Sequence, residues 1–291
     1  MRSSQSLQTR NIGQIGPAVK DEDCVAFLQW SLPELGYRWA GYRKVRRQVC
    51  QRIDRRLREL RLPDFDSYRD YLKNDTGEWD RLDTYCRIPI SRFYRDRSTF
   101  DYLRGTVLPG LLDEALRRGD REFLCWSAGC ASGEEPYTIS LIWCLGLGPH
   151  APALPLRIIA SDIDPHLIAR AESGCYRASS LQDLPIGWRE RAFAHDDDEF
   201  YLNGEFRSGV EFVIGDVRTW APDATVHLLL CRNLAFTYFD DKAQRKVLRH
   251  LTERLRPAGI FLIGKHETLP ENSELQPISS KLGIYRKTGA R

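Results

Sequence analysis

Small residues and carboxylates stand where three predicted strands end. The loop of residues 128–133, Ala-Gly-Cys-Ala-Ser-Gly, follows an apolar run, Asp162 ends the strand-like segment 156–161, and Asp216 follows the strand-like segment 211–214. Glycines let a backbone approach a ligand closely. A carboxylate at a strand end can hold ribose hydroxyls or accept from an adenine amino group. Alone, each feature is also compatible with a structural turn or a helix cap, but their order on successive strands favours a nucleoside cofactor.

The loop differs from those that bind dinucleotides. It lacks the pattern G-x-G-x-x-G, and Glu134 and Glu135 open the helix that follows it. Two carboxylates at a helix N-terminus would repel a pyrophosphate, which otherwise favours that position. The sequence therefore favours a cationic cofactor without phosphates.

The elements that would position these residues change character along the chain. Up to about residue 120, apolar residues recur at helical spacing, whereas from residue 121 short apolar runs alternate with helical stretches. Such alternation predicts a Rossmann-like α/β fold, with a mostly parallel, doubly wound sheet that binds ligands beyond the carboxyl ends of its strands. Gly204 suggests the turn of an inserted antiparallel hairpin. The predicted parts are a mobile polar lead-in (1–20), a basic helical domain (21–90), a connecting helix (91–120), and a catalytic domain (121–291) with an inserted β hairpin or subdomain at about 195–212.

Composition excludes several classes of protein. The chain has 291 residues, a formal net charge of +3 and no apolar run as long as a membrane span. Its first 20 residues lack the apolar region of a secretory signal, so we expect a cytoplasmic protein. The eight cysteines are scattered and lack the paired spacing of zinc sites. We expect them to be reduced and mostly buried, and we expect no metal site.

The segment from Arg38 to Arg61 is strongly basic, with only Asp54 and Glu59 opposing its cations. On a helix, the apolar residues of this segment form one stripe and the arginines cover the other faces. Three interpretations remain open for the basic faces: a solvated surface, a docking surface for an acidic protein, or contact with nucleic acid, for which no recognisable motif is present.

Several motifs resemble the chemotaxis-receptor glutamate methyltransferases of the CheR type. The resemblance covers about residues 22–287, and the loop signature is its most specific part. The motifs that carry it are residues 126–137 (WSAGCASGEEPY), 161–164 (SDID), 171–176 (AESGCY), 231–234 (CRNL) with Tyr-Phe-Asp at 238–240, and 91–96 (SRFYRD).

This resemblance implies S-adenosylmethionine as cofactor and S-adenosylhomocysteine as product. The residues that it implies for cofactor binding are Ala128, Gly129, Glu134, Asp162, Ile163, Asp216, Val217, Asn233 and Leu234. Those that it implies at the transferred methyl group and the acceptor are Ser91, Arg95 and Tyr238. It further implies that the basic segment faces an acidic, chemoreceptor-like protein. An unperturbed glutamate has a pKa near ~4.3, so an acceptor carboxylate is already ionised and needs no general base.

Departures from the family pattern leave the acceptor open. Pro89 replaces a common Asn, residues 235–237 make a spacer one residue longer than usual, and Lys265-His266 replaces His-Ser. His266 is interpreted either as a general base or as a buried structural histidine. The alternatives are therefore a related methyltransferase for a small metabolite or a non-receptor protein, and a non-catalytic regulatory protein that binds S-adenosylmethionine.

Overall fold

The computed structural model describes residues 21–147, 154–271 and 274–289. These residues divide into two compact units. We call residues 21–35 with 42–87 the helical unit, and residues 36–41 with everything described from Ile88 onward the sheet unit. The lead-in predicted for residues 1–20 lies outside the described residues.

The helical unit confirms the predicted all-α domain ahead of the catalytic part. Asp64 and Asp75 begin two of its helices as caps, because their carboxylates accept hydrogen bonds from the backbone N–H of Ser67 (2.8 Å) and Gly77 (3.0 Å). An apolar stripe on each helix is buried in the core of the unit. Its helices are α1 (Asp21–Glu34), α3 (Arg46–Leu60), α4 (Phe65–Asn74) and α5 (Thr76–Cys86); of α2 (Trp39–Tyr42), only Tyr42 belongs to this unit.

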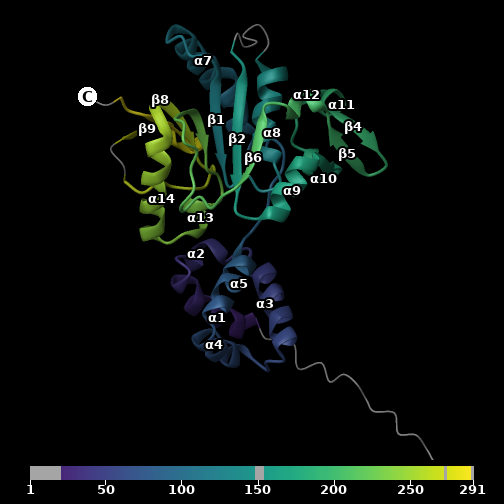
Figure 1. Ribbon diagram of the computed structural model, residues 1–291, viewed down its shortest axis with the longest axis vertical. Helices are drawn as coiled ribbons and strands as arrows, with labels where there is room; N and C mark the ends of the chain where they lie inside the picture. The colour runs from purple at the N-terminus through teal and green to yellow at the C-terminus, as the bar shows by residue number, and fades with distance from the viewer. Residues whose placement is uncertain (1–20, 148–153, 272–273, 290–291) are drawn as a thin grey trace, which may run out of the picture. The chain divides into compact units, whose positions relative to one another are not determined.

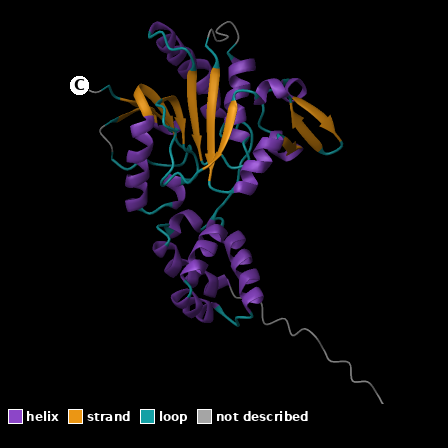
Figure 2. Ribbon diagram, in the orientation of Figure 1, coloured by secondary structure: helices purple, strands orange, loops and turns teal. Residues whose placement is uncertain are grey.

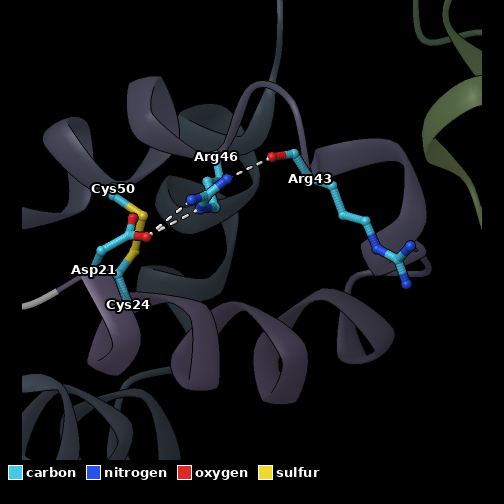
Figure 3. The surroundings of a disulfide bond; sticks show 5 residues. All are labelled: Asp21, Cys24, Arg43, Arg46 and Cys50. Carbon is cyan, nitrogen blue, oxygen red and sulfur yellow. Dashed lines mark hydrogen bonds and ion pairs between the residues drawn. A yellow bond between two sulfur atoms is a disulfide. The ribbon is translucent and has the colours of Figure 1, made fainter.

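A disulfide bond joins Cys24 on α1 to Cys50 on α3, as Figure 3 shows. The prediction of reduced thiols throughout was therefore wrong for this pair. The two residues are separated by 26 positions in the sequence, and only the packing of α1 against α3 brings their Cα atoms to 6.0 Å. Beside the bond, Arg46 donates to the carboxylate of Asp21 (2.9 Å). The other six cysteines are free.

Many cations of the basic segment form hydrogen bonds or ion pairs inside the protein. Arg52 donates to the carbonyl oxygens of Tyr85 (2.9 Å) and Arg87 (2.6 Å), and Arg56 forms a two-bond pair with the buried carboxylate of Glu78. Arg38, Arg46 and Arg58 also have protein partners. Within the described residues, the exposed cations of the segment for which no such bond is found are Arg43, Lys44, Arg47, Arg55 and Arg61.

The sheet unit confirms the predicted Rossmann-like fold with a mostly parallel sheet (Figures 1 and 2). The strand order is β6-β2-β1-β7-β8-β10-β9, in which the first five strands are parallel and β10 runs antiparallel to both β8 and β9. The strands are β1 (Phe123–Ala128), β2 (Leu156–Asp162), β6 (Val210–Ile214), β7 (Val226–Leu230), β8 (Leu255–Leu262), β9 (Leu275–Ser279) and β10 (Ile284–Lys287).

Helices cover the sheet, and their packing fixes the central strands. Every residue of β1 and β7 is buried, as expected for strands of a parallel sheet covered on both faces. Helices α8 and α9 pack on β2 and β6, and α14 packs on β8. The helices of this unit are α6 (Arg97–Tyr102), α7 (Leu108–Arg117), α8 (Glu134–Leu141), α9 (Pro165–Ser173), α10 (Ala178–Leu181), α11 (Trp188–Ala192), α12 (Gly204–Arg207), α13 (Ala235–Tyr238) and α14 (Asp241–Arg254), with π-helical turns at Leu103–Val107 and Ile142–Gly146 and a 3₁₀ turn at Ser280–Leu282.

A second, antiparallel sheet is present, but its position in the sequence differs from the prediction. It contains β3 (Cys175–Arg177), β4 (Phe193–Asp196) and β5 (Glu199–Leu202) in the order β3-β5-β4. The hairpin turns at Asp197, which has a left-handed φ of 49°, and not at Gly204, which begins α12. Residues 210–212 belong to β6 of the main sheet.

Within the described residues, no helix combines the length and the apolar character needed to cross a membrane.

Candidate active site

The parallel strands β6, β2, β1, β7 and β8 all end at one edge of the main sheet. The loop after β1 is bonded to the end of β2, since Gly129 N–H and Cys130 N–H donate to Ser161 O (2.7 and 3.0 Å). Ala131 N–H donates to Asp162 Oδ2 (2.8 Å), and Asp164 N–H donates to Asp162 Oδ1 (3.0 Å). Asp162 thus supports the loop. A carboxylate oxygen carries two lone pairs, so an oxygen that accepts one backbone N–H can also accept a ligand hydroxyl.

Positive φ angles shape this loop at Gly129 (78°) and Gly133 (89°). A Cβ atom on Gly129 would lie 2.3 Å from Leu234 Cδ2, and one on Gly133 would lie 2.8 Å from Ala171 Cβ. Glycine is therefore required at both positions by conformation and by space. Two predicted cofactor residues, Gly129 and Leu234, are brought together by this close approach.

Glu134 is a buried carboxylate, with 1% of the residue exposed. Among the described residues its hydrogen-bond donor is the hydroxyl of Ser132, at 3.0 and 3.2 Å. A buried carboxylate is costly unless it meets a cation or several donors. The chemistry of this group therefore fits a cationic ligand, and it does not fit the anionic pyrophosphate of a dinucleotide.

Asp216 and Val217 lie at the end of β6, where the prediction placed the adenine ring. Val217 is buried. The Asp216 carboxylate accepts from the Arg218 N–H (2.9 Å) and forms a close ion pair with the Arg218 guanidinium (2.8 Å). The expected carboxylate is thus in place, but its principal partner is an arginine of the same loop.

Asn233 follows β7 with a left-handed φ of 57°. Its N–H donates to Glu267 Oε2 (2.8 Å), which also accepts from Gly264 N–H (2.6 Å), while Thr237 Oγ1 donates to Glu267 Oε1 (2.6 Å). Burial raises the pKa of Glu267, and these three hydrogen bonds oppose the rise. Sequence reasoning missed Glu267 as the residue that ties the ends of β7 and β8 to α13, although it follows directly after His266.

The predicted acceptor residues Arg95 and Tyr238 share one electrostatic neighbourhood. Burial raises the pKa of the Tyr238 hydroxyl, and the positive charge of Arg95 partly offsets that rise. Arg95 is half-buried and donates to Ile90 O (2.6 Å). Ser91 is half-buried in the same segment.

The short helix α13, which ends at Tyr238, is held by residues 36–41. The Arg38 guanidinium donates to Phe236 O (2.5 Å) and Thr237 O (3.1 Å), and Arg38 N–H donates to Tyr238 O (2.8 Å). These bonds satisfy carbonyls that a helix end leaves without partners. Arg38 therefore stabilises the fold of the sheet unit.

His266 is exposed, so its interpretation as a buried structural histidine was wrong. The neighbouring Lys265 is also exposed. Pro89 is exposed in the segment that leads to Ser91.

Comparison with known families identifies the chain. Residues 90–284 match the family described as "CheR methyltransferase, SAM binding domain", and residues 43–82 match "CheR methyltransferase, all-alpha domain". The chain belongs to the CheR methyltransferase family. It is accordingly an S-adenosylmethionine-dependent methyltransferase, and its cofactor is S-adenosylmethionine. The acidic, glycine-shaped loop after β1 fits that sulfonium compound.

Relatives of this CheR-family chain carry related names. It is 28% identical to a chemotaxis protein methyltransferase of Listeria monocytogenes over 86% of this chain and 91% of the relative. It is 31% identical to chemotaxis protein methyltransferase 2 of Pseudomonas aeruginosa over 78% of this chain and 80% of the relative. It is also 30% identical to a 104.1 kDa protein of Rhodobacter capsulatus, of whose length the match spans 25%.

Proposed function

We propose that this methyltransferase transfers the methyl group to glutamate carboxylates on an acidic, chemoreceptor-like protein, with Arg95 and Tyr238 at the acceptor. The observation that carries the proposal is that the charge of the half-buried Arg95 guanidinium lowers the pKa of the half-buried Tyr238 hydroxyl, while the charge of Glu267 raises it. An arginine fork binds a carboxylate well, and a phenol hydroxyl can donate one further hydrogen bond.

The chemistry requires positioning rather than proton transfer. S-Adenosylmethionine supplies a methyl group that its sulfonium makes electrophilic. Arg95 holds the acceptor carboxylate, and Tyr238 orients it, so that an ionised oxygen lies in line with the methyl group.

Cofactor binding is assigned to the strand ends. Asp162 accepts from the ribose hydroxyls, and Asp216 and Val217 flank the adenine. Asn233 and Leu234 line the cofactor near the sulfonium, and Gly129 and Glu134 face the methionine portion. The remaining predicted contacts are Ala128 and Ile163. The exposed cations of the helical unit supply long-range attraction for an acidic partner, and such steering weakens as salt is raised.

The test uses S-adenosylmethionine labelled with tritium in the methyl group and a helical receptor fragment rich in glutamate. Carboxyl methyl esters release the label as methanol in alkali, and replacement of the fragment's acceptor glutamates by alanine abolishes incorporation. A product whose label is stable to alkali would instead mean N- or S-methylation and a different acceptor. Normal binding of S-adenosylhomocysteine without transfer to the fragment or to small carboxylic acids would favour a regulatory protein.

A further inference from the structure

Arg232 is a buried cation that lies outside the predicted cofactor and acceptor residues. Its side chain is 2% exposed, and it stands between the end of β7 and Asn233. Its Nη2 donates to Asp96 Oδ2 (2.8 Å) and to the backbone oxygen of Arg95 (2.9 Å), and its Nη1 donates to Glu135 Oε2 (3.2 Å). One guanidinium therefore ties together the end of β7, the start of α8 and the segment that carries Arg95.

That segment has an unusual backbone. Tyr94 and Asp96, on either side of Arg95, both have left-handed φ angles, 57° and 64°. Non-glycine residues in this region are strained, and they persist only where surrounding contacts hold them. Tyr94 N–H donates to Thr138 Oγ1 (2.9 Å), and Arg232 holds the other side through Asp96 and the Arg95 carbonyl.

Charge and packing support this arrangement. The guanidinium carbon of Arg232 lies 4.7 Å from the centre of the Phe100 ring. Glu135, whose side chain is 13% exposed, also accepts from Ser127 Oγ (2.8 Å). A largely buried carboxylate needs a cation and hydrogen bonds to offset its lost hydration, and Arg232 supplies both. Lysine has a single donor centre and could not reproduce these divergent bonds.

We propose that Arg232 is a positioning residue that acts through Arg95: it holds residues 94–96 in the left-handed turn that presents the Arg95 guanidinium to the acceptor carboxylate. This inference rests on the proposed role of Arg95 at the acceptor. It requires no contact between Arg232 and either substrate.

The test is a double-mutant cycle on the full chain with Arg232→Lys, Arg95→Ala and the double variant. The tritium-label assay gives kcat and the acceptor KM, and calorimetry gives the affinity for S-adenosylhomocysteine. The loss of one hydrogen bond to a charged group predicts that Arg232→Lys lowers kcat/KM for the acceptor by about 10- to 100-fold. In the Arg95→Ala background the same change has little further effect, because residues that act as a unit are non-additive.

Two controls separate this role from general damage. Asp96→Asn weakens the hydrogen bond to Arg232 but keeps the buried guanidinium. We therefore expect a smaller loss of kcat/KM, again non-additive with Arg95→Ala. This variant tests the proposal even if Arg232→Lys folds poorly. Arg256→Lys alters a comparable ion pair, with Asp120 (2.6 Å) outside the proposed site, and leaves kcat/KM unchanged.

The outcomes distinguish the inference from the function on which it rests. Additive effects of Arg232→Lys and Arg95→Ala, with Arg95→Ala strongly impaired, would overturn the inference alone. An Arg95→Ala variant with undiminished turnover would overturn both the role of Arg95 and the inference. A loss confined to cofactor affinity in Arg232→Lys would also overturn it, because the change would then act through Asn233.

Discussion

Reduction of the Cys24–Cys50 bond should loosen the helical unit and leave the sheet unit unchanged. The bond closes a loop with a sequence separation of 26 residues. Opening it restores conformational entropy to the unfolded chain, and the chain-entropy relation gives about 3.5 kcal/mol for a loop of this length. Such a loss is a large fraction of the stability of a small domain.

Hydrogen exchange followed by mass spectrometry measures this effect separately in the two units, because amides exchange through local and sub-global opening. A loss of about 3.5 kcal/mol corresponds to roughly 300-fold faster exchange. We expect this acceleration in peptides of α1 and α3 after treatment with a thiol reductant, while peptides of β1 and β7 serve as the internal control. The variant Cys86→Ala removes a free, buried thiol of the same unit and should respond to reductant as the wild type does.

Two results would refute the reasoning. Alkylation of the denatured, unreduced protein should modify six of its eight cysteines, and modification of all eight would show that the bond is not formed. Unchanged exchange in α1 and α3 after verified reduction would show that the unfolded loop gains no freedom when the bond opens.

Two further perturbations test the sheet unit. Burial lowers the pKa of His227 below its ordinary value of 6.5 despite its hydrogen bond to Asp120 (3.1 Å). Below pH 6.5 the unfolded chain therefore binds more protons than the folded protein, and the free energy of unfolding falls as the pH drops. In His227→Gln, the urea midpoints at pH 7.5 and 5.5 should differ less than in the wild type, and an unchanged difference would contradict this. Gly129→Ala places a Cβ atom 2.3 Å from Leu234 Cδ2, in a left-handed backbone conformation that costs about 1–2 kcal/mol for a residue other than glycine. Calorimetry should therefore show affinity for S-adenosylhomocysteine reduced by at least about 10-fold. Equal affinity would mean that the close approach of Gly129 to Leu234 does not shape the cofactor loop.

The residues at the strand ends were predictable because two local rules determine their placement. The spacing of apolar residues and the local composition locate short buried strands. Parallel strands that are linked by helices then bring their carboxyl ends to one edge of the sheet. Gly129, Asp162 and Asn233 therefore lie at the same edge of one sheet, although they are far apart in the sequence.

The partners of these residues were not predictable, because they come from distant segments. Arg232 meets Asp96 across 136 positions, and Arg38 meets Phe236 across 198. No local pattern distinguishes such an arginine from one that faces solvent. The displaced hairpin has another cause: Asp tolerates the left-handed region, so the turn formed at Asp197 while the sequence analysis favoured the glycine at 204.

The two sides of the proposed site are held by different kinds of hydrogen bond, and this affects which of them tolerates substitutions. The proposed cofactor loop is held by backbone hydrogen bonds from Gly129 and Cys130 to Ser161 O at the end of β2. The proposed acceptor side depends on side chains, since the Arg95 carbonyl accepts from the Arg232 guanidinium. Backbone bonds survive most substitutions, whereas a side-chain network changes with each residue. The departures from the family pattern at Pro89 and at residues 265–266 can therefore change the methyl acceptor while S-adenosylmethionine binding is retained. For this reason the acceptor, rather than the cofactor, has to be identified by analysis of the methylated product.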